Sequence, residues 1–358
     1  MKKVAVVGTQ GVPAQYGGFE TLTEYLIGKH HSEDIQYTVF CSSKSYSKKQ
    51  KSYNGAILKY IPLDANGIQS IFYDILSLLK VIRGYDVILV LGVSGCMFLP
   101  IFRLFCRKKL VINIDGLEHR REKWGKSAKW FLKQSEAMAV RFADIIITDN
   151  KGIYDYVQDT YKRESALIAY GGDHALRNIS EEREEEILLK YGLQKSKYAL
   201  SICRIEPENN CHLVIGAYLN SPEKLVFVGN WDKNEYGQKL KASCSQEANI
   251  QTVSGVYDLD ELYVLRKNCR IYIHGHSAGG TNPSLVEAMF LGRPIMAFNV
   301  VYNRETTENK AIYFNDIESL RSHISSEADI EPVGLQMREV ADNRYRWISI
   351  IKQYENCY

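Results

Sequence analysis

Residues 274–298 have the sequence HGHSAGGTNPSLVEAMFLGRPIMAF. The order of glycines, prolines and apolar residues in this stretch strongly limits the local structures that it can form. The apolar run before it, at 271–273, predicts a buried strand. After a loop of small residues, a helix is expected to begin at Pro283 with Asn282 as its cap and to end near Gly292. A strand, a glycine loop and a helix N-terminus in this order form an anion site, because backbone N–H groups and the helix dipole favour negative charge.

Glu287 lies inside this predicted helix, on a face made mostly of apolar residues. A carboxylate there is either partnered or bound to a ligand, because an unpaired buried charge is costly. It is the partly exposed edge of an amphipathic helix, or it accepts hydrogen bonds from sugar hydroxyls one turn beyond a phosphate loop. The second interpretation suits a nucleotide-sugar.

The N-terminus predicts another strand followed by a glycine loop. The apolar run at residues 3–8 is followed by TQGVPAQYGG, and a helix is expected to start near Phe19. Gly17 and Gly18 precede this helix, so its N-terminus could bind an anion. Glu20 is expected to cap the helix rather than to contact a ligand. Neither the spacing G-x-G-x-x-G nor a P-loop motif occurs.

Polar residues follow two further predicted strands. Asp115 and Glu118 come directly after the apolar run at 110–114, and Arg204 comes after the run at 198–203. Ligands of open α/β sheets bind beyond the carboxyl ends of strands, so both positions are candidates for a site. Arg204 can neutralise a phosphate, whereas the group around Asp115 is either a site or a solvated turn with mutual salt bridges.

With 358 residues, the chain is long enough for two domains with separate cores, and its 45% hydrophobic residues are typical of globular proteins. Its eight cysteines show no paired spacing, so we expect reduced thiols. No metal is expected, because the DLD at 258–260 is better explained as a helix capping box. Neither a signal peptide nor a membrane-spanning helix is expected.

Charge is distributed unevenly along the chain. Residues 1–172 carry 24 Lys and Arg against 16 Asp and Glu, whereas residues 173–358 carry 21 against 26. A basic first half suggests an anionic surface as partner, although chance scatter accounts for it as well. The stretch CMFLPIFRLFCRKK at 96–109 is either a core helix with a basic end or a surface helix that lies in a lipid interface. Nucleic acid is not expected as a partner.

The segment at 274–298 resembles the donor-binding motif of family-four retaining glycosyltransferases of the GT-B fold, in particular their rhamnosyltransferase-like branch. That family has two glutamates with seven residues between them. Glu287 matches the second, which holds the nucleotide ribose, whereas Gly279 stands in place of the first, which contacts the donor sugar. Arg204 matches the family's phosphate-binding arginine, and Asn209 stands where the family has a lysine.

The resemblance covers nearly the whole chain and implies two doubly wound, Rossmann-like α/β domains that face a cleft. We expect an acceptor domain at 1–172, joined by a C-terminal helix at about 343–358, and a nucleotide-sugar domain at 173–342. A single final helix is expected over 337–354. The resemblance further implies catalytic roles for Arg204 and Asp115. It implies donor-phosphate contacts for Gly17, Gly18, Gly279, Gly280, Thr281 and Asn282, and sugar or phosphate contacts for Asn209, His276 and Glu118.

The sequence patterns and the family resemblance together predict a metal-independent glycosyltransferase. The expected donor is dTDP-rhamnose, the expected acceptor is a lipid-diphosphate-linked sugar, and the expected location is the cytoplasmic face of the membrane, where the protein is peripheral. Two alternatives remain open at this point: a nucleotide-sugar epimerase of the same fold, and a non-catalytic protein that binds sugar nucleotides.

Overall fold

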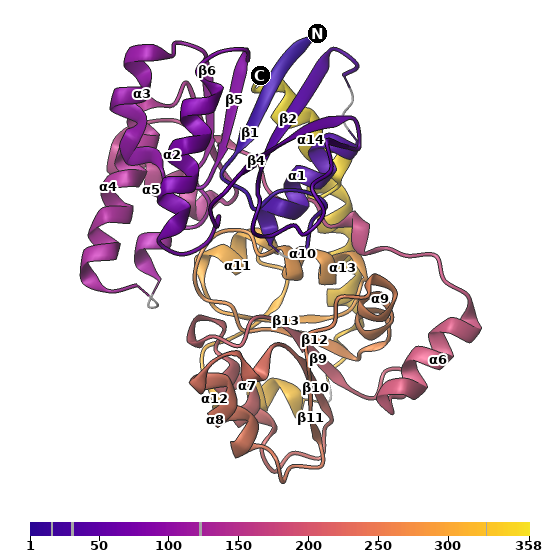
Figure 1. Ribbon diagram of the computed structural model, residues 1–358. Coiled ribbons are helices and arrows are strands. Elements are labelled where there is room, and N and C mark those ends of the chain that lie inside the picture. Colours follow the sequence, from indigo (N-terminus) through magenta and orange to yellow (C-terminus); the bar gives the residue numbers. More distant parts are fainter. Residues whose placement is uncertain (16, 30–31, 122–123, 327) are drawn as a thin grey trace. The chain divides into compact units, whose positions relative to one another are not determined.

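A computed structural model describes residues 1–358 except 16, 30–31, 122–123 and 327. The chain divides into two compact units: the first comprises Met1–Tyr170 and Trp347–Tyr358, and the second comprises Gly171–Arg346. Each unit is built on a mainly parallel sheet with helices packed against it (Figure 1). The predicted α/β class with two parallel-sheet domains is therefore confirmed.

The first unit contains an eight-stranded sheet in the order β3-β4-β2-β1-β5-β6-β7-β8. Its pairs are parallel except for β3 and β4, which are antiparallel. The strands are β1 (Lys2–Val7), β2 (Ile35–Ser42), β3 (Ser52–Tyr53), β4 (Ala56–Ile61), β5 (Val87–Leu91), β6 (Lys109–Asn113), β7 (Ile145–Thr148) and β8 (Ala166–Leu167). The helices are α1 (Gly18–Gly28), α2 (Gln69–Val81), α3 (Leu99–Phe105), α4 (Lys126–Phe142), α5 (Lys151–Tyr161) and α14 (Trp347–Asn356).

The second unit contains a six-stranded parallel sheet in the order β11-β10-β9-β12-β13-β14. The strands are β9 (Ala199–Ile202), β10 (Leu225–Val228), β11 (Ile250–Val253), β12 (Ile271–His274), β13 (Ile295–Phe298) and β14 (Ile312–Phe314). The helices are α6 (Glu181–Tyr191), α7 (Cys211–Tyr218), α8 (Glu235–Ser243), α9 (Leu259–Asn268), α10 (Pro283–Phe290), α11 (Val301–Thr306), α12 (Ile317–Ile324) and α13 (Glu331–Arg344).

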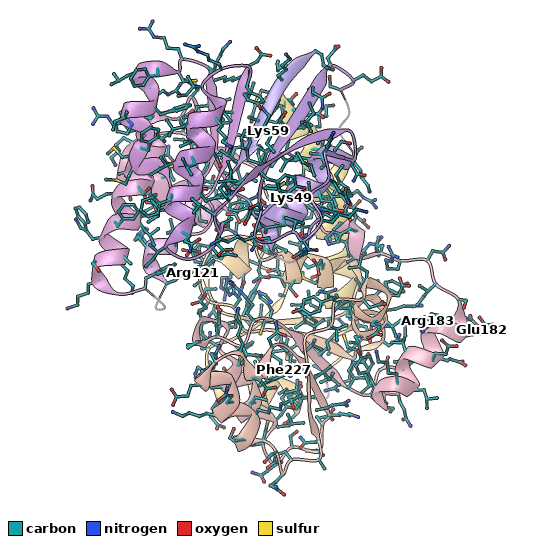
Figure 2. All side chains as sticks on the ribbon, in the orientation of Figure 1. Lys49, Lys59, Arg121, Glu182, Arg183 and Phe227 are labelled. Carbon is teal, nitrogen blue, oxygen red and sulfur yellow. The ribbon has the colours of Figure 1, made fainter. Side chains whose placement is uncertain are left out.

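Each unit has its own hydrophobic core, and the inner strands β5 (VILVL) and β10 (LVFV) are apolar and buried along their whole length, as expected for parallel sheets covered on both faces. Phe227 of β10, labelled in Figure 2, is fully buried in the second core. In the first core, α14 packs beside α1: the ring of Trp347 stacks on Tyr25 with centroids 4.5 Å apart, and Asn113 Nδ2 donates to Tyr354 Oη at 2.7 Å.

The end of the chain departs from the sequence prediction. One helix was expected over 337–354, but α13 ends at Arg344, and α14 begins at Trp347. Tyr345 is fully buried, and its hydroxyl donates to the backbone oxygen of Thr306 at 2.9 Å. Its buried tertiary contact holds the chain at the break, and periodicity alone gives no sign of it.

Candidate functional site

Both sheets have a topological switch point, where neighbouring strands connect in opposite directions along the sheet. In the second unit the switch lies between β9 and β12, and in the first unit it lies between β1 and β5. Ligands of doubly wound sheets bind beyond the carboxyl ends of the strands at such a point. The segments that follow these four strands are therefore the first places to look for a site.

Beyond β12, the strand, loop and helix predicted from the sequence are confirmed. The helix α10 begins at Pro283, and the side chain of Asn282 caps it by accepting from Ser284 N at 3.0 Å. Gly279 has φ of 91°, a left-handed conformation that a glutamate adopts only under strain. The backbone at this position therefore favours glycine over the glutamate of the family.

The first turn of α10 is tied directly to the end of β9. Ser284 Oγ donates to the backbone oxygen of Ile202 at 3.1 Å and lies 2.8 Å from Tyr272 Oη. Arg204 comes two residues after Ile202, so the N-terminus of α10 and this arginine belong to one edge of the second unit. A helix N-terminus and a guanidinium side by side provide an environment for an anion.

Arg204 keeps part of its side chain in solvent. The side chain is 36% exposed, and its ion pair with Glu206 is long, at 3.9 Å between Nε and Oε2. A guanidinium with this freedom can turn toward a phosphate and bind it through two donors.

Asn209, which stands in the place of the family lysine, braces the site from inside. The residue is 3% exposed; its Nδ2 donates to the backbone oxygen of Arg204 at 2.6 Å, and its Oδ1 lies 2.6 Å from His276 Nδ1. Because Nδ2 is used by Arg204, Oδ1 accepts from an Nδ1–H of His276. Asn209 therefore joins the segment after β9 to the loop after β12.

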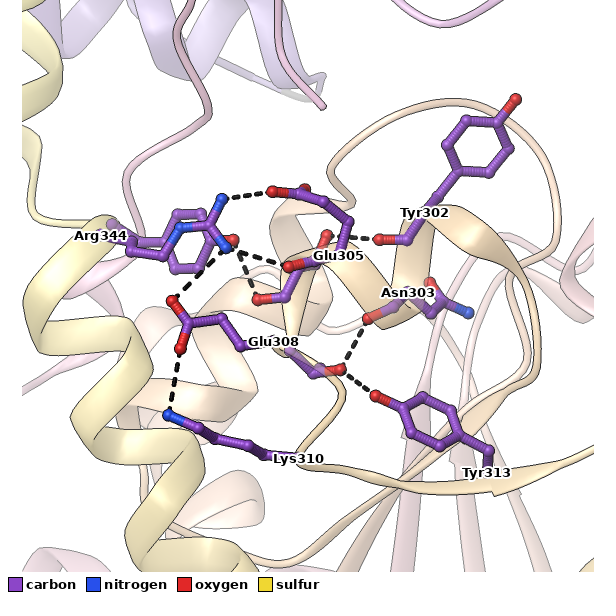
Figure 3. A network of polar contacts seen from close by, with 10 residues as sticks. Tyr302, Asn303, Glu305, Glu308, Lys310, Tyr313 and Arg344 are labelled. Carbon is purple, nitrogen blue, oxygen red and sulfur yellow. Dashed lines mark hydrogen bonds and ion pairs between the residues drawn. The ribbon is translucent and has the colours of Figure 1, made fainter. Parts of the chain in front are cut away.

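The loop that carries His276 is held by a network around α11. Asn303 Nδ2 donates to the backbone oxygen of His276 at 2.8 Å. Figure 3 shows the support behind it: Thr307 Oγ1 donates to the backbone oxygen of Asn303 at 2.7 Å, and Arg344 of α13 pairs with Glu305. The position of His276 thus depends on residues far away in the sequence.

Glu287 is partnered through both carboxylate oxygens. Its Oε2 lies 2.5 Å from Nη2 of Arg266, and its Oε1 lies 3.2 Å from Nε2 of His174. Burial alone would raise the pKa of this carboxyl, but the positive charge of Arg266 and the contact with His174 hold the pKa below its usual value. Glu287 is therefore an ionised carboxylate in a fixed orientation, and its side chain remains 18% exposed.

The two partners of Glu287 were not identified from the sequence. Arg266 belongs to α9, and its side chain is only 5% exposed. His174 lies a few residues after β8, the last strand of the first unit. An arginine on the apolar side of a predicted helix is a signal for a buried ion pair, but its partner depends on tertiary packing.

His274, at the end of β12, is 2% exposed, and its Nε2 has no hydrogen-bond partner within the described part of the chain. Burial lowers its pKa to about 3, so the imidazole is neutral at physiological pH. His274 therefore does not supply the positive charge that the family lysine would bring.

In the first unit, Glu20 organises the loop after β1. The residue is 7% exposed, and it accepts from Thr9 Oγ1 at 3.0 Å and from Gln10 N at 2.8 Å. Gly17 has φ of 134°, and a Cβ there would lie 2.0 Å from Glu20 Oε2, so the loop requires glycine. The sequence favoured a capping role for Glu20, but its side-chain contacts are chiefly with this loop. Gly18 begins α1 directly afterwards.

Asp115 follows β6 with φ of 60°, in the left-handed region that non-glycine residues rarely occupy. Its backbone N–H donates to Asn113 Oδ1 at 2.9 Å. Burial and, to a smaller extent, the charge of Asp115 raise the pKa of Glu20, so the two carboxylates lie close enough to interact. Backbone strain of this kind is a feature of functional sites.

Glu118 and His119 make contacts within the first unit. Glu118 Oε1 lies 2.9 Å from Arg121 Nε, and its Oε2 accepts from Trp124 Nε1 at 3.1 Å, as in the alternative of a turn with salt bridges. His119 Nδ1 lies 2.9 Å from Oε2 of the buried Glu136. These contacts fix the chain that leads away from Asp115.

Two family comparisons cover most of the chain. Residues 183–339 match the family described as "Glycosyl transferases group 1", and residues 1–173 match the family described as "Domain of unknown function (DUF1972)". Residues 183–339 of the second unit are therefore similar to group 1 glycosyltransferases. No curated protein matches the chain.

Solved structures share the fold over the whole length. Sucrose-phosphate synthase from Thermosynechococcus elongatus has a TM-score of 0.82 at 14% identity, covering 100% of this chain and 98% of that chain. HepE of Anabaena in complex with UDP-glucose has a TM-score of 0.77 at 15% identity, covering 99% and 98%. The catalytic domain of starch synthase IV from Arabidopsis thaliana, bound to ADP and acarbose, has a TM-score of 0.70 at 12% identity, covering 100% and 98%. The fold is that of GT-B glycosyltransferases.

Proposed function

We propose that this protein is a retaining glycosyltransferase that moves a sugar from a nucleotide-sugar to a lipid-linked glycan. The observation that carries the proposal is the edge of the second unit, where Arg204 follows β9 and the N-terminus of α10 is tied to the end of the same strand, with the ionised Glu287 on α10. The group 1 glycosyltransferase match to residues 183–339 supports the same assignment.

On this proposal, the second unit binds the donor. Gly279, Gly280, Thr281 and Asn282 present backbone N–H groups to the diphosphate, and Arg204 supplies the positive charge. Glu287 accepts a hydrogen bond from a ribose hydroxyl through lone pairs that Arg266 and His174 leave open, since each carboxylate oxygen can accept more than one bond. UDP-glucose in the structure of HepE supports a nucleotide-sugar as the class of ligand.

Charge on the leaving diphosphate grows as the glycosidic bond breaks. Arg204 and the dipole of α10 would stabilise this charge without a metal ion, and His276, braced by Asn209, is a further candidate contact. Among the described residues, no group of three or more His, Cys, Asp or Glu could hold a metal. Retention would follow from front-face attack, with a donor phosphate oxygen taking the proton of the acceptor hydroxyl.

The first unit is proposed to bind the acceptor. Asp115, in its strained conformation, would accept a hydrogen bond from the acceptor hydroxyl or from the transferred sugar. Gly17 and Gly18, held by Glu20, would contact the donor phosphates, and Glu118 would position the loop of Asp115 through Arg121 and Trp124.

The proposed donor is dTDP-rhamnose. Gly279 offers no side-chain acceptor where the family has a glutamate, so a sugar with fewer hydroxyl groups leaves fewer groups unpaired. A 6-deoxyhexose meets this condition. We further propose that the protein works at the cytoplasmic face of the membrane, where a lipid-diphosphate-linked acceptor would be presented.

A matched assay of dTDP-rhamnose, UDP-glucose and GDP-mannose with a lipid-diphosphate-linked sugar tests the proposal, with the anomeric configuration of the product read by NMR. We expect transfer with retention and a preference for dTDP-rhamnose. Preference for another donor would overturn the sugar assignment alone. Conversion of the donor sugar without acceptor would indicate an epimerase, and nucleotide binding without turnover of any donor would indicate a binding protein.

A further inference from the structure

Helix α2 is apolar on two opposite faces. One face enters the core of the first unit through Tyr73, Leu78 and Val81. The other carries Ile68, Phe72, Leu76 and Leu79, which are 77%, 59%, 39% and 45% exposed. The spacing of four, four and three residues places these four side chains in one stripe along the helix. A helix that is apolar on both faces is ordinarily covered on both.

Helix α3 and the turn before it repeat this arrangement. Leu99 and Phe102 are buried, whereas Met97, Ile101, Leu104 and Phe105 are 37%, 53%, 77% and 69% exposed. The sequence left two alternatives for this segment, a core helix or a surface helix, and the structure supports part of each. One face packs inside, and the other is an apolar stripe in solvent.

The two stripes belong to one surface. A shallow hollow is lined by Leu79, Lys80, Ile82 and Arg83 from the end of α2 and by Phe105 from the end of α3. Figure 1 shows α2 and α3 lying side by side in the first unit. We call the surface made by the two stripes the α2–α3 face.

Cations border the α2–α3 face at one end. Lys80 and Arg83 end the stripe of α2, and Arg107 and Lys108 follow α3, all of them exposed. Two acidic residues lie nearby: Asp86 Oδ1 is 3.9 Å from Lys108 Nζ and offsets one of these charges, and Asp144 pairs with a further cation, Arg103 of α3, at 2.8 Å. The border therefore keeps a positive charge next to a large apolar area.

From this combination we propose that the α2–α3 face lies in the interface of an anionic lipid bilayer. The apolar side chains would enter the boundary between headgroups and acyl chains, and the four cations would meet lipid phosphates. A second copy of the chain is a poorer occupant, because it would present the same mainly cationic border, which does not complement the four cations. No helix within the described residues is long and apolar enough to cross a membrane, so the surface would lie on the bilayer.

The inference deepens the proposed function, since it names the membrane contact of an enzyme whose acceptor is lipid-linked. The proposed membrane contact depends on that function only for its biological role. The exposed stripes and their bordering cations stand whether or not the chain transfers a sugar.

Co-sedimentation of the full chain with vesicles of phosphatidylcholine and about 30% phosphatidylglycerol tests the proposal. We expect binding at low salt, weaker binding to pure phosphatidylcholine, and partial release at about 0.5 M salt. The double variant Phe72→Ser/Leu104→Ser should bind about tenfold more weakly or worse, because it removes apolar area from both stripes. The matched control is Leu189→Ser on α6 of the second unit, a leucine 82% exposed, which should bind like the parent.

Absence of vesicle binding by the parent at low salt would overturn the proposal, as would parental binding by the double variant. Loss of a parental dimer in the double variant, without any vesicle binding, would assign the face to a second copy. Thermal melting checks that each variant is folded. Transfer to a water-soluble acceptor analogue should be unchanged in the double variant; if the parent itself shows no transfer but binds vesicles, the proposed function fails and the α2–α3 face stands.

Discussion

At the switch point of the second unit, the strand ends present Arg204 and the N-terminus of α10, and the carboxylate nearby is held ionised by a buried arginine. At the switch point of the first unit, Glu20 of α1 accepts a hydrogen bond from Gln10 in the loop after β1. Asp115 follows β6, the strand next to β5. Burial raises the pKa of Glu20, whereas Arg266 helps to hold the pKa of Glu287 down. The two doubly wound sheets thus hold carboxylates near their switch points in different surroundings, one accepting from a hydroxyl and a backbone N–H and one paired with an arginine.

This difference agrees with the proposed division of labour. A diphosphate needs positive charge and N–H donors, whereas an acceptor hydroxyl needs a hydrogen-bond acceptor. If the proposal is right, topology determines where a ligand site forms in these sheets, and the residues at the strand ends determine which ligand the site accepts.

The largest effect is expected from Arg204→Ala, which removes the positive charge from the edge of the second unit. Turnover should fall at least about 100-fold, because the contact strengthens as the leaving diphosphate gains charge. Steady-state kinetics with the preferred donor measure this effect. The control is Arg183→Ala on α6 (Figure 2), an arginine whose Nη1 lies 3.1 Å from Oε2 of Glu186. Turnover within a few-fold of the parent would remove Arg204 from the mechanism.

Two substitutions of Glu287 distinguish a structural role of its carboxylate from a role in ligand binding. In Glu287→Ala the buried Arg266 loses its partner, so the free energy of unfolding should fall by about 3 kcal/mol. Glu287→Gln keeps the shape and one acceptor, so it should melt closer to the parent but bind nucleotide about tenfold more weakly. Thermal melting and calorimetric titration measure the two effects. If Glu287→Gln retains parental nucleotide affinity, the carboxylate serves the fold alone.

Asp115→Asn tests the first unit in the same way. We expect transfer to fall about tenfold, with nucleotide affinity unchanged, because the substitution weakens an acceptor-side hydrogen bond and leaves the second unit intact. Comparison of the transfer rate with the Kd of the nucleotide measures the split. An equal loss of nucleotide affinity would contradict the assignment of this carboxylate to the acceptor.

The smallest effect concerns Asp74, a residue of α2 whose buried carboxyl accepts from Gly95 N at 3.1 Å. Burial raises its pKa from 3.8 to about 8. The folded state therefore holds a proton that the unfolded state releases, and the associated stability is lost as pH rises through about 8. Asp74→Asn cannot ionise, so its melting temperature relative to the parent should be higher at about pH 9 than at about pH 6. A pH-independent difference would show that this carboxyl does not titrate as expected.

The amino-acid sequence by itself determined the local part of this protein. The strand, loop and helix around residues 271–290 were predictable because their signals act over a few residues: Asn282 caps, Pro283 fits the first turn, and Gly279 allows a left-handed backbone. The α/β class with two domains was expected from the predicted strands together with the family resemblance, and the two parallel sheets confirm it. The exposed stripe of α2 was also present in the spacing of its residues, although burial was needed to recognise it.

Only the tertiary structure decided which side chains meet. The contact of Asn209 with His276 and the pairing of Glu287 with Arg266 and His174 join separate elements, and no local rule selects these partners. The break between α13 and α14 likewise depends on the burial of Tyr345. The physical reason is that strand and helix formation depends mainly on neighbouring residues, whereas the charge state and orientation of a buried polar group depend on whatever the fold brings against it.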